Sequence, residues 1–275
     1  MFANRQLYIA TKHNKELVIA PIMEKGLSVK CTACDGLDTD VLGTFSGEVE
    51  RVYSPLDTVR KKCELAISKT KCDLVIASEG SFTSHPLIGF VPVDEEILFF
   101  YDVKNEIEII TKVISTKTNY RQGKFLDYKN LAEFAVGIKF PSHAIILKDN
   151  KNSRTIKGIN DWKKLKNSFH ELLNNGPVTA ETDMRAMFNP SRMDVIKCCT
   201  QKLLSSILSR CPNCNFPGFM ETDSVSGLPC QACGLPTSSI IKNIFKCKKC
   251  DFISEKFYPN KKVMEDPMYC DYCNP

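Results

Sequence analysis

The chain has 275 residues, of which 43% are hydrophobic, and a formal net charge of +5. This length suits about two domains with a genuine core, and the mild charge gives only a weak preference for anionic partners. No apolar run approaches the about 18 residues of a membrane span, and residues 1–6 lack a signal-peptide pattern, so we expect a cytoplasmic protein.

The first segments alternate between strand-like and helix-like patterns. Residues 7–10 and 27–31 are predicted strands, and the apolar residues 17–23 predict a helix that Pro21 disturbs. A second helix begins at Ser54-Pro55, and a short buried strand is predicted at residues 74–77. This succession predicts a parallel βαβ arrangement.

The following segments add antiparallel strands and more helices. Two strand-like runs flank Lys104-Asn105 and predict a hairpin. Helices are expected at residues 128–139, at residues 162–172 and after Asn189-Pro190, and a strand at residues 144–148. We therefore predict an α/β domain over residues 1–210, with a mixed central sheet and flanking helices.

Fourteen cysteines in a cytoplasmic chain require an explanation, because disulfides rarely persist in that compartment. Eight of them form four Cys-x-x-Cys pairs after residue 210, which are Cys211/Cys214, Cys230/Cys233, Cys247/Cys250 and Cys270/Cys273. Gaps of 15 and 19 residues separate the first pair from the second and the third from the fourth, as in four-cysteine zinc sites. Residues 211–275 are thus predicted to form tandem zinc ribbons with two structural zinc ions.

Some alternatives for this tail stay open. Spacing also allows cross-braced pairing, first with third and second with fourth, and iron in a rubredoxin-like site is the main alternative metal. Four thiolates leave no open position on zinc, which argues against a catalytic ion. A fifth pair, Cys31/Cys34, is interpreted as ordinary reduced thiols.

Nucleic acid is not an expected partner of the tail. From Cys211 onward, seven lysines and no arginine face seven acidic residues, and eight thiolates on two zinc ions add a net charge of about −4. Because binding to phosphate backbones needs excess positive charge, contact with a protein partner, or capping of the main domain, is the favoured role.

Charged residues gather where predicted strands and helices begin or end. Glu79 follows the buried strand 74–77, and Gly80 is predicted to permit a turn there. The other candidates are Lys15, Asp38, Asp40, Asp57 and Arg185. Carboxylates with a lysine and an arginine are the groups needed to bind a magnesium polyphosphate.

The blocks Asp38-Thr-Asp, Ala77-Ser-Glu-Gly-Ser-Phe82 and Asn189-Pro-Ser-Arg-Met193, with the terminal Cys270-Asp-x-Cys-Asn-Pro, resemble an uncharacterised bacterial family. That family is a domain of unknown function with a cysteine-rich tail. The resemblance covers nearly the whole chain and implies no activity.

A more distant resemblance links residues 1–210 to the inosine/xanthosine triphosphate pyrophosphatase superfamily, most closely its non-canonical purine NTP phosphatase branch. Thr11 and Lys15 match that branch's Ser-Thr-Asn-Pro-x-Lys, although Lys12 and His13 replace Asn and Pro. Three further segments match the branch in the same order, and these are Asp57-Thr-Val-Arg60, Asp73 through Glu79-Gly80-Ser81, and Gly176 to Arg185.

This second resemblance implies a magnesium-dependent hydrolase that cleaves a nucleoside triphosphate, or a related diphosphate-containing metabolite, between the α and β phosphates. Asp57 and Glu79 would hold magnesium and orient water, with Asp38 or Asp40 completing the metal shell. Lys15 and Arg185 would neutralise the phosphates, and Thr11, with nearby backbone amides and the Gly80-Ser81 segment, would position them. The competing hypothesis is a non-catalytic module that senses a nucleotide and docks a protein through its ribbons.

Overall fold

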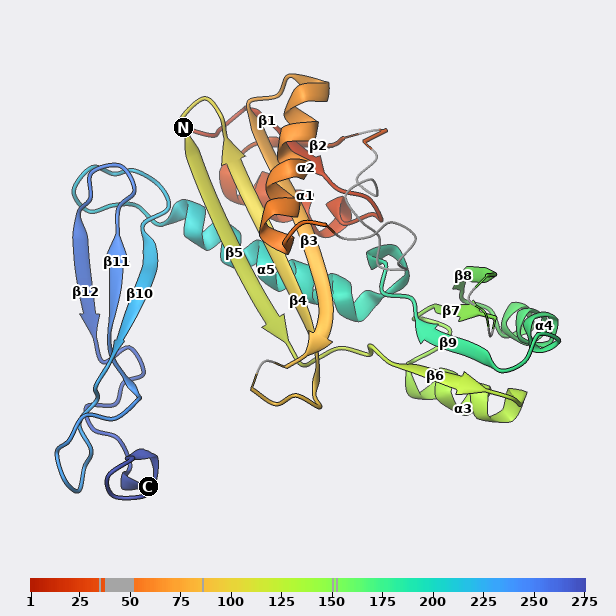
Figure 1. The fold of residues 1–275 in the computed structure, drawn as a ribbon. Coiled ribbons are helices and arrows are strands. Elements are labelled where there is room, and N and C mark those ends of the chain that lie inside the picture. The colour runs from red at the N-terminus through yellow and green to blue at the C-terminus, as the bar shows by residue number, and fades with distance from the viewer. Residues whose placement is uncertain (35, 38–51, 86, 150, 152) are drawn as a thin grey trace. The chain divides into compact units, whose positions relative to one another are not determined.

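The structure is a computed structural model that describes all residues except 35, 38–51, 86, 150 and 152. The chain divides into two compact units, Met1–Leu204 and Ser205–Pro275. We call them the first unit and the C-terminal unit (Figure 1). As predicted, the architecture is mixed α/β with a mixed central sheet and flanking helices, and a small antiparallel sheet follows it.

A five-stranded mixed sheet in the order β2-β1-β3-β4-β5 is the centre of the first unit. The strands β2, β1 and β3 are parallel, whereas β3, β4 and β5 are antiparallel. Their bounds are β1 Gln6–Ala10, β2 Lys30–Ala33, β3 Leu74–Ser84, β4 Pro92–Asp102 and β5 Ile107–Ser115.

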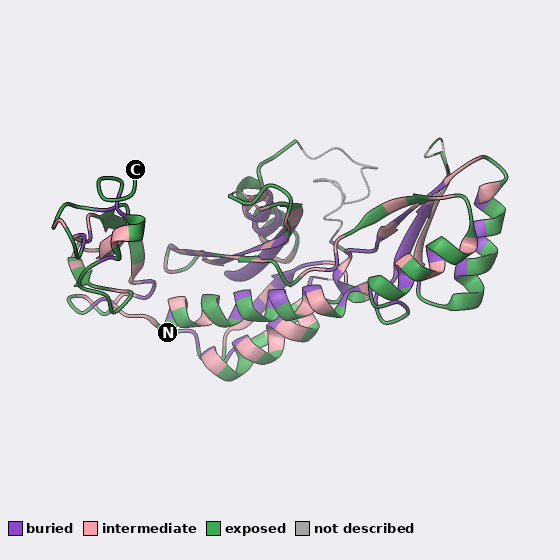
Figure 2. Cartoon of the chain, turned by 90° about the horizontal axis from the view of Figure 1, so that it is seen from below, coloured by how far each residue is buried: buried purple, intermediate pink, exposed green. Residues whose placement is uncertain are grey.

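Three helices cover the two faces of this sheet (Figures 1 and 2). They are α1 (Glu16–Leu27), α2 (Pro55–Thr70) and α5 (Pro190–Leu208). The helix α2 covers one face alone, while α1 and α5 lie together on the other. Gly26 allows that close approach, because a Cβ there would lie 2.4 Å from the side chain of Leu204.

Two predictions, the start of one helix and the presence of one hairpin, are confirmed. Two other predictions are wrong. The helix α2 begins after the N-cap Ser54 with Pro55 in its first turn, and the hairpin of β4 and β5 is present. The helix α1, however, runs unbroken through Pro21, which lies on its exposed side. The strand β3 continues to Ser84 and pairs with β4 over its full length, so Gly80 does not form a turn.

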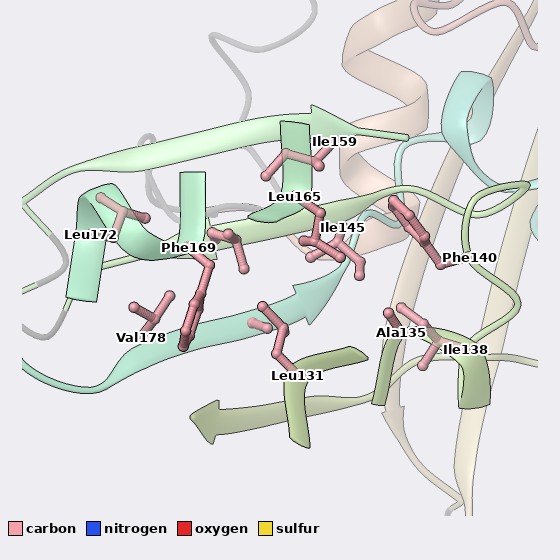
Figure 3. Close-up of a cluster of buried hydrophobic side chains, with 12 residues drawn as sticks. Leu131, Ala135, Ile138, Phe140, Ile145, Ile159, Leu165, Phe169, Leu172 and Val178 are labelled. Carbon is pink, nitrogen blue, oxygen red and sulfur yellow. The ribbon is translucent and has the colours of Figure 1, made fainter. Parts of the chain in front are cut away.

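A second sheet in the first unit was not anticipated. Its order is β6-β9-β7-β8 and all its pairs are antiparallel. Its elements are β6 Gln122–Phe125, α3 Tyr128–Gly137, β7 Ile145–Lys148, β8 Thr155–Ile159, α4 Trp162–Leu173 and β9 Val178–Thr182. Apolar side chains from α3, α4 and the sheet, such as Leu131, Ile145 and Phe169, form its core (Figure 3).

The C-terminal unit contains a three-stranded antiparallel sheet of β10 (Met220–Ser226), β11 (Ile240–Lys246) and β12 (Ile253–Phe257). Within residues 211–275, all of which the structure describes, Leu228 is the only large aliphatic side chain that is buried. Most of this unit is therefore intermediate or exposed (Figure 2). Among the described residues, no helix has the length and apolar character needed to cross a membrane.

Candidate functional site

The four Cys-x-x-Cys pairs share one local structure that turns both thiols to the same side. In each pair, the carbonyl of the first cysteine accepts a hydrogen bond from the backbone N–H four residues later. In three pairs this later residue has a positive φ, and the three are Asn215 (φ 59°), Gly234 (φ 73°) and Asp251 (φ 54°). Asn, Gly and Asp tolerate this left-handed backbone better than other residues do.

The pairs combine into two four-cysteine clusters in a cross-braced order. One cluster holds Cys211, Cys214, Cys247 and Cys250, and the other holds Cys230, Cys233, Cys270 and Cys273. The sequential pairing that the gap lengths favoured is therefore wrong, and the cross-braced alternative is observed. Gap lengths could not distinguish the two, because both bring four thiols together.

The sulfur distances fit a tetrahedral metal site. Within the first cluster, Cys211 Sγ lies 3.7 Å from Cys250 Sγ, and Cys214 Sγ lies 3.6 Å from Cys247 Sγ. In the second cluster the corresponding distances are 3.8 and 3.7 Å. A tetrahedron with Zn–S bonds of about 2.3 Å has sulfur separations of about 3.8 Å, whereas a disulfide bond is about 2.05 Å long. Both clusters thus fit structural zinc ions.

A second group of interest is a set of buried charged side chains in the first unit. We call it the charged cluster, and it consists of Lys15, Lys62, Glu79, Asp94, Glu96 and Arg192. Each of these side chains belongs to a residue that is at most 9% exposed. Charges are buried in this way only when they are paired or serve a binding site.

The charged cluster lies where the parallel part of the sheet ends. The last residue of β1, Ala10, pairs with Ala77, so the edge of β3 is not covered by β1 from Ser78 onward. Lys15 enters here from the loop after β1, and its Nζ donates a hydrogen bond to Ser78 Oγ at 3.1 Å. Two consecutive residues of this loop, His13 and Asn14, have positive φ values of 67° and 60°. Strained backbone of this kind is concentrated at ligand-binding loops.

Alternation along β3 divides the cluster between the two faces of the sheet. Glu79 faces α2, where Lys62 forms an ion pair with its carboxylate and donates to the Ser78 carbonyl at 3.2 Å. On the opposite face, Arg192 of α5 donates from Nε to Glu96 Oε1 at 2.6 Å. Gly80 leaves room for this second pair, since a Cβ there would lie 2.4 Å from the Arg192 guanidinium.

Two carboxylates on the α5 face are incompletely satisfied. Both oxygens of Asp94 and the Oε2 of Glu96 are buried and have no hydrogen-bond partner among the residues that the structure describes. Burial, together with the charge of Glu96, raises the pKa of Asp94 to about 8. Burial and the nearby Arg192 lower the pKa of Lys15 to about 8. Both groups therefore titrate near neutral pH, as groups at functional sites often do.

Of the sequence candidates, Lys15 and Glu79 belong to the charged cluster. Gly80 and Ser81 follow Glu79 in β3. Thr11 is buried in the loop after β1, and its hydroxyl donates to the Lys12 carbonyl. Asp38 and Asp40 lie outside the described residues.

The other two candidates have local partners. Asp57 is exposed at the start of α2, where its N–H and carboxylate bind the Ser54 hydroxyl of the N-cap. The guanidinium of Arg185 donates two hydrogen bonds to the carboxylate of Asp183, at 3.0 and 2.6 Å. Neither residue has a contact with Glu79 that the structure describes.

Four members of the charged cluster escaped the sequence analysis. A signal was available for Lys62, which shares the spacing of the buried face of α2 with Val59, Cys63 and Ala66. Asp94 and Glu96 alternate with the residues of β4 that face α2, and both precede the apolar run at residues 97–100 of that strand. Arg192 lies within the block Asn189 to Met193, which also pointed to a family resemblance.

The fold and these sites define a mixed α/β protein with a C-terminal unit built on two four-cysteine clusters. The chain belongs to a family described as a domain of unknown function (DUF6671), whose model matches residues 62–275. This match includes both cysteine clusters and every member of the charged cluster except Lys15. No curated protein matches the chain. The resemblance to inosine/xanthosine triphosphate pyrophosphatases gains no support from these comparisons and stays a hypothesis.

Proposed function

We propose that the chain is a magnesium-dependent hydrolase that cleaves a nucleoside triphosphate, or a related diphosphate-containing metabolite, between the α and β phosphates. The single observation that carries this proposal is the charged cluster at the point where β1 ends. A structural ion-pair network would leave fewer carboxylate oxygens without partners, because unpaired buried charge is costly.

The cationic side chains are suited to bind phosphates. Lys15 and Lys62 both donate to Ser78, from the loop after β1 and from α2. They thereby converge on one point of β3 from two separate elements. Cations fixed before the substrate arrives stabilise the charge that develops on the leaving pyrophosphate. In this proposal Lys62 takes the part that the sequence suggested for Arg185, which is bound to Asp183.

The carboxylate of Glu79 is a suitable magnesium ligand. Magnesium prefers oxygen ligands and is commonly held by one or two carboxylates together with substrate phosphates. The helix α2, which carries Asp57, lies on the sheet face where Glu79 meets Lys62. When bound, the ion would neutralise phosphate charge, and Glu79 would orient the water that attacks the α phosphorus. The bond to the bridging oxygen then breaks and pyrophosphate leaves.

The test is a screen of nucleoside triphosphates with and without magnesium, with release of pyrophosphate as the readout. Glu79→Gln and Lys15→Met are each expected to lower kcat/KM at least about a hundredfold, because each removes charge from the reacting centre. Glu64→Gln and Lys25→Ala are matched controls on exposed positions of α2 and α1, and should leave turnover unchanged.

Two results would contradict the proposal. One is the absence of magnesium-dependent pyrophosphate release with any nucleotide, while Lys15→Met still weakens nucleotide binding. That result would favour the competing function, a module that binds a nucleotide without turnover. The other is full activity in Glu79→Gln, which would remove Glu79 from the mechanism.

The competing function has one observation of its own. The C-terminal unit exposes several large side chains, among them Phe257 (51%), Tyr269 (56%) and Tyr272 (74%). Exposed aromatic residues are enriched at protein–protein interfaces, so a protein partner could dock on this unit. Replacing Tyr269 and Tyr272 by Ser should then abolish partner binding and leave nucleotide binding intact.

A further inference from the structure

A pocket in the first unit is lined by residues that belong neither to the charged cluster nor to the cysteine clusters. Its volume is about 870 Å³, within the range of small-molecule sites. Residues of β5, of the segment that follows it, of the end of α3 and of the start of α5 line it. Val113 and Val195 give part of its wall an apolar character.

The polar part of the wall is predominantly positive. Lys117, Arg121 and Lys139 line the pocket, against the single carboxylate of Asp194. Within the part of the chain that the structure describes, neither Lys117 nor Arg121 has an ion pair, and Lys139 donates to the Ser191 hydroxyl at 3.3 Å. These cations are thus available to an anion.

The hydroxyl of Ser191 is held at the pocket wall by a neutral histidine. Ser142 donates its own hydroxyl hydrogen to the Lys139 carbonyl, so it can only accept from His143 Nδ1, which lies 3.0 Å away. The Nε2 of His143 is then unprotonated, and it accepts from the Ser191 backbone N–H at 3.2 Å and lies 2.9 Å from Ser191 Oγ. Burial and the nearby Lys139 lower the pKa of His143, which keeps the ring neutral.

This arrangement allows the Ser191 hydroxyl to donate a hydrogen bond to a ligand. Because Nε2 keeps the Ser191 backbone N–H as its donor, the hydroxyl hydrogen can turn toward an anion in the pocket without leaving His143 unsatisfied. We propose that this pocket is a second binding site, for a small molecule that carries a phosphate monoester. Lys117, Arg121, Lys139 and the Ser191 hydroxyl bind the phosphate, and the apolar wall contacts the organic part.

The test is isothermal titration of the full chain with phenyl phosphate and with inorganic phosphate, at constant ionic strength. Phenyl phosphate should bind more tightly, because its ring buries apolar surface. Arg121→Gln and Lys139→Gln are each expected to raise Kd about tenfold, as loss of a charge-assisted hydrogen bond does. Ser191→Ala should raise Kd about fivefold, as expected for a neutral hydrogen bond.

Controls separate this site from the charged cluster and from general surface charge. Lys129→Gln changes an exposed lysine of α3 that does not line the pocket, and should leave Kd unchanged. In a Lys15→Met background, which removes a cation of the charged cluster, Arg121→Gln should still raise Kd about tenfold. The proposal is overturned if neither phosphate binds saturably, if Lys129→Gln weakens binding as much as Arg121→Gln, or if only Lys15→Met weakens it.

Discussion

The charged cluster and the two cysteine clusters both gather polar groups away from water, but different interactions hold them. In the charged cluster, side chains of opposite sign form ion pairs on a sheet that a hydrophobic core already stabilises. In the C-terminal unit the buried side chains are mainly the first cysteines of the four pairs, with Leu228 as their only large aliphatic companion in residues 211–275. We therefore expect the C-terminal unit, with so small a core, to need a metal to fold, and the first unit to fold without one.

The difference also bears on where function lies. Thiolates that fill all four positions around zinc leave no place for substrate. The charged cluster, in contrast, contains carboxylate oxygens of Asp94 and Glu96 in β4 that have no hydrogen-bond partner among the described residues. Catalysis is therefore expected in the first unit, and zinc is expected to act as a structural element.

The largest expected effect is loss of the metal. The purified chain should carry about two zinc ions, and a strong chelator should unfold the C-terminal unit while the first unit keeps its cooperative transition. Elemental analysis gives the stoichiometry, and the fluorescence of Trp162, the only tryptophan, reports on the first unit. A chain that contains no zinc and whose cysteines are disulfide-bonded would contradict this prediction.

A double substitution distinguishes the cross-braced arrangement from the sequential one. Cys211→Ser with Cys247→Ser removes two ligands from one cluster in the structure, so about one zinc ion should remain. The matched double variant, Cys211→Ser with Cys230→Ser, removes one ligand from each cluster and should weaken both sites. With sequential pairing, the outcomes of the two variants would be exchanged.

The next effect in size concerns the buried ion pair of the charged cluster. Arg192 and Glu96 are fully buried, so Arg192→Met leaves a buried carboxylate without compensation and should lower the free energy of unfolding by about 3–5 kcal/mol. The pair of Arg154 and Glu171 has side chains that are 54% and 50% exposed, so Arg154→Met should cost at most about 1 kcal/mol. Urea unfolding followed by Trp162 fluorescence measures both, and equal costs would show that the burial of the first pair is unimportant.

A smaller effect is a dependence on pH that comes from Asp94. Its pKa is about 8 in the folded chain, raised by burial and by Glu96 from an ordinary value of 3.8, while Arg192 and Lys15 act in the opposite direction. Between these two values the folded state binds more protons than the unfolded state, so this contribution to stability is present at low pH and is lost as pH rises toward 8. The pKa of Lys15 falls from 10.5 to about 8 in the folded chain. Between these two values the unfolded state binds more protons, so the contribution of Lys15 to stability rises with pH above about 8.

The Asp94→Asn variant isolates this contribution. Asparagine resembles the protonated acid and cannot ionise, so the stability of the variant relative to the native chain should improve steadily from pH 5 to pH 8. Urea unfolding at several pH values measures the trend, with Asp194→Asn, an exposed position, as control. Parallel pH profiles for the native chain and Asp94→Asn would show that Asp94 is ionised throughout.

Sequence patterns predicted what depends on local chemistry. Ser54-Pro55 set the start of α2, the polar turn at Lys104-Asn105 marked the hairpin, and the Cys-x-x-Cys spacing identified the cysteines that form the two clusters. The pairing of the knuckles depends on which distant segments meet, and the gap lengths do not encode that. The second sheet was missed for a similar reason, because β6, β8 and β9 are only four or five residues long.

The charged cluster shows the same limit. Lys15 and Glu79 could be identified because each lies beside a strand signal, but the end of the predicted strand was placed at Ala77 because polar residues follow it. In the structure β3 continues, since β4 supplies partners for its backbone as far as Ser84. The other members of the cluster come from α2, β4 and α5. Tertiary packing brings these elements to β3, and no local sequence pattern shows that they meet there.

The smallest expected effect is that of removing residues 211–275, which hold both cysteine clusters. A chain that ends at Arg210 keeps the whole of α5 and every member of both hydrophobic clusters. Because these interactions lie within the first unit, its free energy of unfolding should change by less than about 1 kcal/mol, and pyrophosphate release, if present in the full chain, should persist. Trp162 fluorescence in urea and the magnesium-dependent assay measure the two properties. An insoluble product, or a broad transition without cooperativity, would show that the cysteine clusters stabilise the first unit, so that the contrast between a metal-dependent unit and a self-sufficient one fails.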